Sequence, residues 1–99
     1  MMAFKSEDEI RAILISGTPL GSDTSQVKNF FREENIQSIG FYESSGYPLL
    51  KPKIGAMLLK GLVGSYREIV FKVSVVGNWV FDSQGKLIEI KVEKEKDAF

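Results

Sequence analysis

The sequence contains no cysteine and no histidine. The absence of cysteine excludes disulfide bonds, thiolate metal sites and cysteine nucleophiles. The absence of histidine removes the commonest general base near neutral pH and the commonest ligand of transition metals. Catalysis would therefore depend on carboxylate, lysine, tyrosine or serine side chains. We predict from these absences that the protein is not an enzyme, holds no metal and uses no cofactor.

The chain also lacks net charge and long apolar runs. Thirteen basic residues balance thirteen acidic ones, so no basic field attracts nucleic acid. No segment approaches the roughly 20 apolar residues of a membrane-spanning helix, and no apolar signal-peptide core follows Met1–Phe4. We therefore expect no nucleic-acid binding and no membrane insertion. The expected location is cytoplasmic by default, or periplasmic if an N-terminal signal has been removed.

The sequence does contain enough apolar residues for one hydrophobic core. Of its 99 residues, 43% are hydrophobic and 11% are aromatic. A chain of this length normally forms one domain and buries roughly two thirds of the surface that it exposes when unfolded. We expect residues 1–99 to form a single domain that is a monomer or a weak homodimer.

The first third of the chain predicts two short helices. Ser6–Glu9 and Asp23–Gln26 each place a capping residue three positions before Glu or Gln, which is the pattern of a capping box. Apolar residues at helical spacing follow each box. They are Ile10, Ile13 and Leu14 in the first segment and Val27, Phe30 and Phe31 in the second.

The remainder predicts four strands. Ile36–Tyr42 and Ile54–Val63 are expected as the first two, with a loop at Glu43–Lys53 between them and a turn at Gly64–Ser65. A hairpin is then expected over Ile69–Glu93, broken at Asp82–Gly85. The order α-α-β-β-β-β predicts a two-layer α+β fold, with both helices on one face of a four-stranded antiparallel sheet.

The predicted hairpin allows finer expectations about faces and turn. Alternation places Leu87 with Glu89, Lys91 and Glu93 on one face of the last strand, and Ile88, Ile90 and Val92 on the other. Gly85 is expected to have a positive φ. Asp82 is either an acid or cation ligand, or a turn residue that binds backbone amides, and the turn interpretation is favoured.

A few aromatic and basic residues are candidates for binding. Trp79 is either an exposed anchor for a partner or part of the core, where Gly77 would leave room for a bulky neighbour. Tyrosines and lysines in or near the predicted loop and turns could line a polar pocket, although edge packing of the tyrosines is the favoured alternative. These residues are Tyr42, Tyr47, Lys51, Lys53 and Tyr66.

Two segments resemble a known type of bacterial domain. Residues 17–31 read GTPLGSDTSQVKNFF and residues 74–92 read SVVGNWVFDSQGKLIEIKV. They resemble the opening helix and terminal hairpin of SmpA/OmlA (BamE-like) and β-lactamase-inhibitor-protein-like domains. Lys94 and residues 97–99 are also similar to the ends of uncharacterised bacterial proteins. The resemblance implies two helices on an antiparallel sheet and no enzyme activity, but the chain lacks the lipid-attachment cysteine of the lipoproteins.

These observations favour a non-catalytic module that binds another protein, whose identity the sequence leaves open. The binding surface is expected on the outer face of the sheet or in the Glu43–Lys53 loop. One alternative is a small ligand-binding or hydrolytic domain that uses tyrosine, lysine and carboxylate groups. Another is an accessory protein of the bacterial envelope.

Overall fold

In the described residues, two helices and four strands follow one another in the predicted order. The computed structural model describes residues 5–43 and 57–98, so most of the predicted Glu43–Lys53 loop, with Tyr47, Lys51 and Lys53, lies outside the described residues. The elements are α1 (Glu7–Gly17), α2 (Thr24–Glu33), β1 (Gln37–Glu43), β2 (Met57–Glu68), β3 (Phe71–Phe81) and β4 (Leu87–Ala98).

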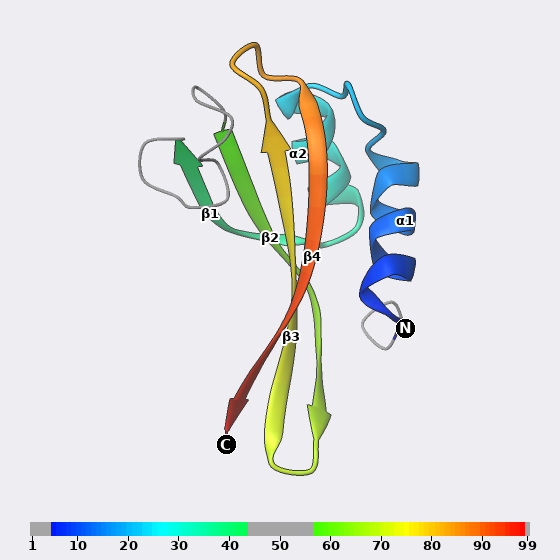
Figure 1. Ribbon diagram of the computed structural model, residues 1–99, viewed down its shortest axis with the longest axis vertical. Helices are drawn as coiled ribbons and strands as arrows, with labels where there is room; N and C mark the ends of the chain where they lie inside the picture. Colours follow the sequence, from blue (N-terminus) through cyan, green and yellow to red (C-terminus); the bar gives the residue numbers. More distant parts are fainter. Residues whose placement is uncertain (1–4, 44–56, 99) are drawn as a thin grey trace.

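The four strands form one antiparallel sheet in the order β1-β2-β3-β4, so β1 and β4 are its edges. Each strand pairs with the next one along the chain, which is the predicted meander. Both helices lie against one end of the sheet (Figure 1), and residues of α1 and α2 share a core cluster with β2, β3 and β4. The fold is therefore the predicted two-layer α+β arrangement.

Both helices begin at the predicted capping boxes. In α1 the Ser6 hydroxyl accepts a hydrogen bond of 3.1 Å from the Glu9 N–H, and the Glu9 carboxylate accepts one of 3.3 Å from the Ser6 N–H. Asp23 and Gln26 make the same reciprocal pair at the start of α2. The bonds from the Ser6 backbone and hydroxyl lower the pKa of Glu9 below its ordinary value of 4.5.

The core lies between the helices and the face of the sheet that carries Trp79. The rings of Phe31 and Trp79 meet edge to face, with centroids 4.6 Å apart. Gly61 and Gly77 lie directly opposite each other on β2 and β3, beneath these rings. A Cβ at Gly77 would lie 2.4 Å from Trp79 Cζ3, and one at Gly61 would lie 2.7 Å from Phe31 Cζ. The two glycines therefore provide the space for the aromatic pair, as expected for Gly77.

The predicted turn at Gly64–Ser65 is wrong. β2 continues through both residues to Glu68, with an irregularity in the pairing between Leu62 and Gly64. The turn lies instead at residues 69 and 70, and Glu68 pairs with Phe71. Glycine favours turns locally, but here the strand pairing continues past it because Gly64 lies beside a bulge, where glycine is common.

The predicted face of Leu87 is also wrong. Val80 pairs with Glu89 and Phe81 pairs with Leu87, so Ile88 is an extra residue in β4. This bulge reverses the alternation at the start of the strand. Leu87 consequently shares the core face with Ile90, and both are buried.

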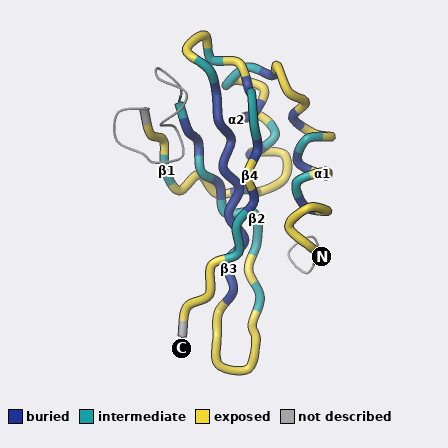
Figure 2. Tube along the Cα trace, viewed as in Figure 1, coloured by how far each residue is buried: buried dark blue, intermediate teal, exposed yellow. Residues whose placement is uncertain are grey.

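The sheet is longer than the helical layer that covers it. The end of β2, the turn, the start of β3 and the end of β4 extend past both helices as a twisted projection (Figure 1). We call this projection the arm and define it as residues 65–74 and 93–98. Figure 2 shows that most of its residues are exposed or partly exposed, whereas the part of the sheet beside the helices is largely buried. The molecule is accordingly elongated, with extents of 43 × 27 × 21 Å.

Candidate functional site

Trp79 is fully buried, with none of its surface exposed. Its Nε1–H donates a hydrogen bond of 3.0 Å to the Thr18 hydroxyl, which is also buried and in turn donates to the Leu14 carbonyl. Burial with a satisfied indole N–H fits the core interpretation of Trp79 and not the exposed anchor. Trp79 offers no surface to a partner in this structure.

Tyr42 and Tyr66 do not converge on a pocket, because they lie on opposite faces of the sheet. Tyr42 pairs with Leu58 on the face away from the helices, and its ring covers Gly40. Tyr66 lies on the helix side and packs against the core. The Lys94 ammonium lies 5.4 Å from the centre of the Tyr66 ring, within the range of a cation–π contact.

The outer face of the sheet, away from the helices, exposes little apolar surface at its centre. Leu58, Val76 and Val80 lie on this face and are all buried. Asn78 between them is also buried. Its Nδ2 donates to the Lys91 carbonyl at 3.3 Å, while its Oδ1 has no hydrogen-bond partner among the residues that the structure describes. Among the described residues, the large exposed hydrophobic side chains lie elsewhere. Those on the arm are Ile69, Val70 and Phe71, and the others are Ile13, Leu20 and the β1 residues Ile39, Phe41 and Tyr42.

The tip of the arm carries three consecutive apolar residues, Ile69, Val70 and Phe71. Ile69 is 101% exposed and Val70 is 56% exposed, the highest values among the large exposed hydrophobic side chains of the described residues. They form a two-residue connection between Glu68 and Phe71. Among the described non-glycine residues only Asn35 has a positive φ, so neither turn residue has one. Two-residue hairpins usually have Asn-Gly or a similar pair with positive φ, so the tip has an unfavourable sequence for its own turn.

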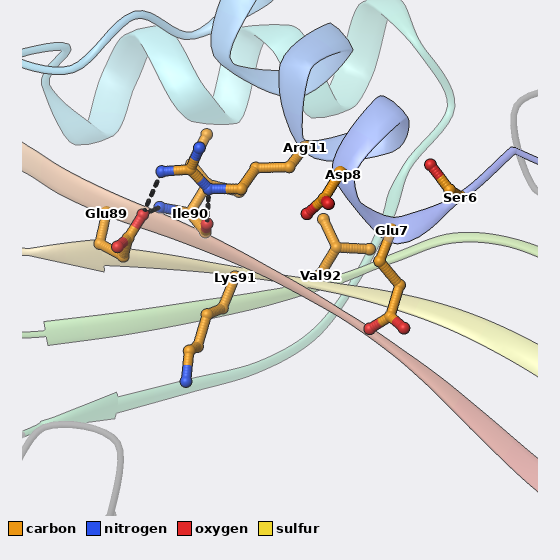
Figure 3. A pocket seen from close by; sticks show the side chains of 8 residues that line it. All are labelled: Ser6, Glu7, Asp8, Arg11, Glu89, Ile90, Lys91 and Val92. Atoms are coloured by element: carbon orange, nitrogen blue, oxygen red, sulfur yellow. Dashed lines mark hydrogen bonds and ion pairs between the residues drawn. The ribbon is translucent and has the colours of Figure 1, made fainter.

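The outer edge of β4 is capped by side chains where it runs beside α1. The Ile90 N–H donates to the Glu89 carboxylate at 2.9 Å, and the Ile90 carbonyl accepts a bond of 2.8 Å from Arg11 Nε. Arg11 also pairs with Glu89 at 2.6 Å (Figure 3). This pair is about 40% exposed and contributes little to stability as a charge pair. Its structural effect is to satisfy the edge backbone at Ile90.

A groove of about 540 Å³ lies between the start of α1 and β4. Figure 3 shows Arg11 turned toward Glu89, with Lys91 pointing away from it. Of the tyrosines and lysines proposed from the sequence, the structure describes Tyr42 and Tyr66, and neither lines the groove. The lining residues are Ser6, Glu7, Asp8, Arg11, Glu89, Ile90, Lys91 and Val92.

The described parts of the chain hold no group of three or more carboxylates placed to bind a metal ion. Of the two helices in these same residues, neither is long and apolar enough to cross a membrane.

Neither the tip nor the edge of β4 was predicted from the sequence as a candidate surface. A signal for the tip was present, because the run Ile69–Phe71 is apolar with no turn residue in it. This run was instead assigned to a strand, because the turn was predicted at Gly64–Ser65. The contact of Arg11 with Glu89 joins residues 78 positions apart, and no local pattern predicts it.

No protein-family model, curated protein or solved structure matches this chain. The resemblance to SmpA/OmlA domains therefore rests on the two sequence segments alone.

Proposed function

We propose that this protein is a non-catalytic protein-interaction domain that binds its partner through the tip of the arm. The observation that supports the proposal is the full exposure of Ile69 at the end of a projection that extends past the helices. Exposed apolar side chains gathered at one point are typical of interaction sites. The body of the domain holds the arm in place through the buried core around Trp79.

The sequence of the tip supports this proposal because Ile69 and Val70 are unfavourable residues for a two-residue hairpin turn. A β-hairpin of this length is stabilised by residues that accept a positive φ, and Ile and Val are among the least suited to that conformation. Departures from local sequence preference are expected mainly at functional positions. The exposed Ile69 and Val70 side chains make no contribution to the core, so a role in binding accounts for them.

The proposal is tested with the double variant Ile69→Asn/Val70→Gly. These residues favour a two-residue hairpin turn and remove the apolar tip. The wild-type and variant proteins are immobilised at equal density and exposed to a lysate of the source organism. A protein retained in stoichiometric amount by the wild type should be lost from the variant.

Leu20→Asn is the matched control, since Leu20 is 54% exposed but lies in the loop between the helices, away from the arm. It should retain the partner in full. Equal retention by the tip variant, or equal loss from both variants, would show that the tip is not the binding surface.

A further inference from the structure

Along the arm β4 is an edge strand, and no strand among the described residues pairs with its outer side. At Ile90 both backbone groups point away from β3, since they bond to Glu89 and Arg11. In an antiparallel strand the backbone groups of every second residue point to the same side. The N–H and C=O groups of Lys94 and Lys96, four and six residues after Ile90, therefore also point away from β3. An unpaired strand edge of this kind is a template for another strand.

The charges of this open segment are sorted by face. Lys94 and Lys96 lie on the helix side of the sheet, opposite Val75 and Val73 of β3. The acidic residues of the segment lie on the outer side of the sheet and alternate along the strand with the two lysines of the helix side. They are Glu93, Glu95 and Asp97. Three of these five residues are exposed and the other two are partly exposed. The edge therefore carries lysines on one side and carboxylates on the other. Lys96 is paired with Glu68 at 3.1 Å, and Lys94 Nζ donates to the Lys5 carbonyl at 2.8 Å.

This sorting opposes pairing between two copies of the chain. An antiparallel pair of β4 strands centred on Glu95 places residues of the same face opposite each other. Glu95 would then face Glu95, Glu93 would face Asp97, and Lys94 would face Lys96. Like charges directly opposite each other destabilise a strand pair. The charge pattern thus disfavours self-association through this segment.

We infer that the edge of β4 at residues 93–97 pairs with an extended segment of the partner protein whose charges are the reverse of its own. Such a segment carries basic side chains on the outer face of the sheet and acidic ones on the helix face. Main-chain hydrogen bonds to Lys94 and Lys96 then supply affinity, and the charge rows decide which face of the segment lies on the helix side of the sheet. Phe71 pairs with Ala98 at the end of β4, so this strand leads directly to the apolar tip.

The inference rests on the proposed interaction function and deepens it by naming the chemistry of the partner. The probe is a second copy of the full chain with reversed charges, made with Glu93→Lys, Lys94→Glu, Glu95→Lys, Lys96→Glu and Asp97→Lys. Glu68→Lys is added because Lys96 pairs with Glu68 at 3.1 Å, and the reversal restores that pair. The tip is unchanged in this variant, so the result is independent of the test of the tip.

Sedimentation of each protein alone should give a monomer, and an equal mixture should give a heterodimer that dissociates in high salt. In the mixture, amide hydrogen exchange of Lys94 and Lys96 in the wild-type chain should slow, while that of their neighbours in β4 should change little. A mixture that stays monomeric, or a wild type that dimerises equally well alone, would overturn the inference.

A synthetic peptide with the reversed charges at positions 91–98 is the second probe and is used if the variant chain does not fold. It should slow exchange of the same two amides in the wild type, and a peptide with the natural charges should not. Equal effects of both peptides would also contradict the inference. Neither outcome bears on the tip, which is tested by capture with the Asn-Gly variant.

Discussion

Trp79 of β3 and Thr18, the residue that follows α1, are joined by a hydrogen bond of 3.0 Å between two buried groups. The Thr18 hydroxyl in turn donates a hydrogen bond of 2.7 Å to the Leu14 carbonyl in α1. The sheet and the first helix are therefore linked by a polar contact inside an apolar core. This contact fixes the helical layer at one end of the sheet and leaves the arm free.

Truncation of Trp79 should remove most of the stability of the domain. Trp79→Ala deletes a fully buried ring that contacts Phe31 and should cost roughly 3–5 kcal/mol. Urea denaturation followed by circular dichroism measures this loss. A loss below about 1 kcal/mol would place Trp79 at the surface, against its observed burial.

Removal of the Thr18 hydroxyl should leave the indole N–H buried without an acceptor. Thr18→Val keeps the shape of the side chain, and we expect a loss of about 1–3 kcal/mol. Thr18→Ser retains the hydroxyl and should lose less. Fluorescence of Trp79, the single tryptophan of the chain, reports the unfolding of both variants. A smaller loss for Thr18→Val than for Thr18→Ser would show that the methyl group matters more than the hydrogen bond.

A side chain at Gly77 should overpack the core. Gly77→Ala places a Cβ 2.4 Å from Trp79 Cζ3 and should destabilise the protein by roughly 1–3 kcal/mol. Trp79→Phe removes Cζ3, so the alanine should cost less in that background. A double-mutant cycle of unfolding free energies measures the coupling. Additive losses would contradict the steric explanation.

The β3–β4 turn should tolerate Asp82→Asn but not Gly85→Val. Gly85 has a φ of 77°, and Asp82 Oδ1 accepts bonds from the Gln84 and Lys86 N–H groups, at 2.9 and 3.0 Å. Asn can accept the same bonds, whereas valine is strained at positive φ and should cost about 1 kcal/mol or more. Thermal melts compare the two. If Asp82→Asn instead abolished binding without shifting the melt, Asp82 would be a functional group.

The helices and the Asp82–Gly85 turn could be predicted because their signals are local. Each capping box spans four residues, and the positive φ of Gly85 follows from a short turn sequence. These features are set by bonds between residues that are close in the chain.

The end of β2 and the face of Leu87 in β4 could not be predicted, because both depend on how these strands pair with β3. The bulge at Ile88 moves Leu87 into the core, and the pairing of Glu68 with Phe71 carries β2 past Gly64. A local pattern contains neither the bulge nor the partner strand. The candidate surface was missed for the same reason, since the tip exists only because β2 and β3 extend to residues 69 and 70.

The stability of the Ile69→Asn/Val70→Gly variant tests most directly the claim that the tip serves binding and not folding. Surface substitutions that touch nothing usually change stability by less than about 0.5 kcal/mol, and Asn-Gly suits a two-residue turn. The account predicts a free energy of unfolding, from urea denaturation, equal to or higher than that of the wild type. A loss of more than about 1 kcal/mol would contradict it, because the apolar tip would then stabilise the fold itself.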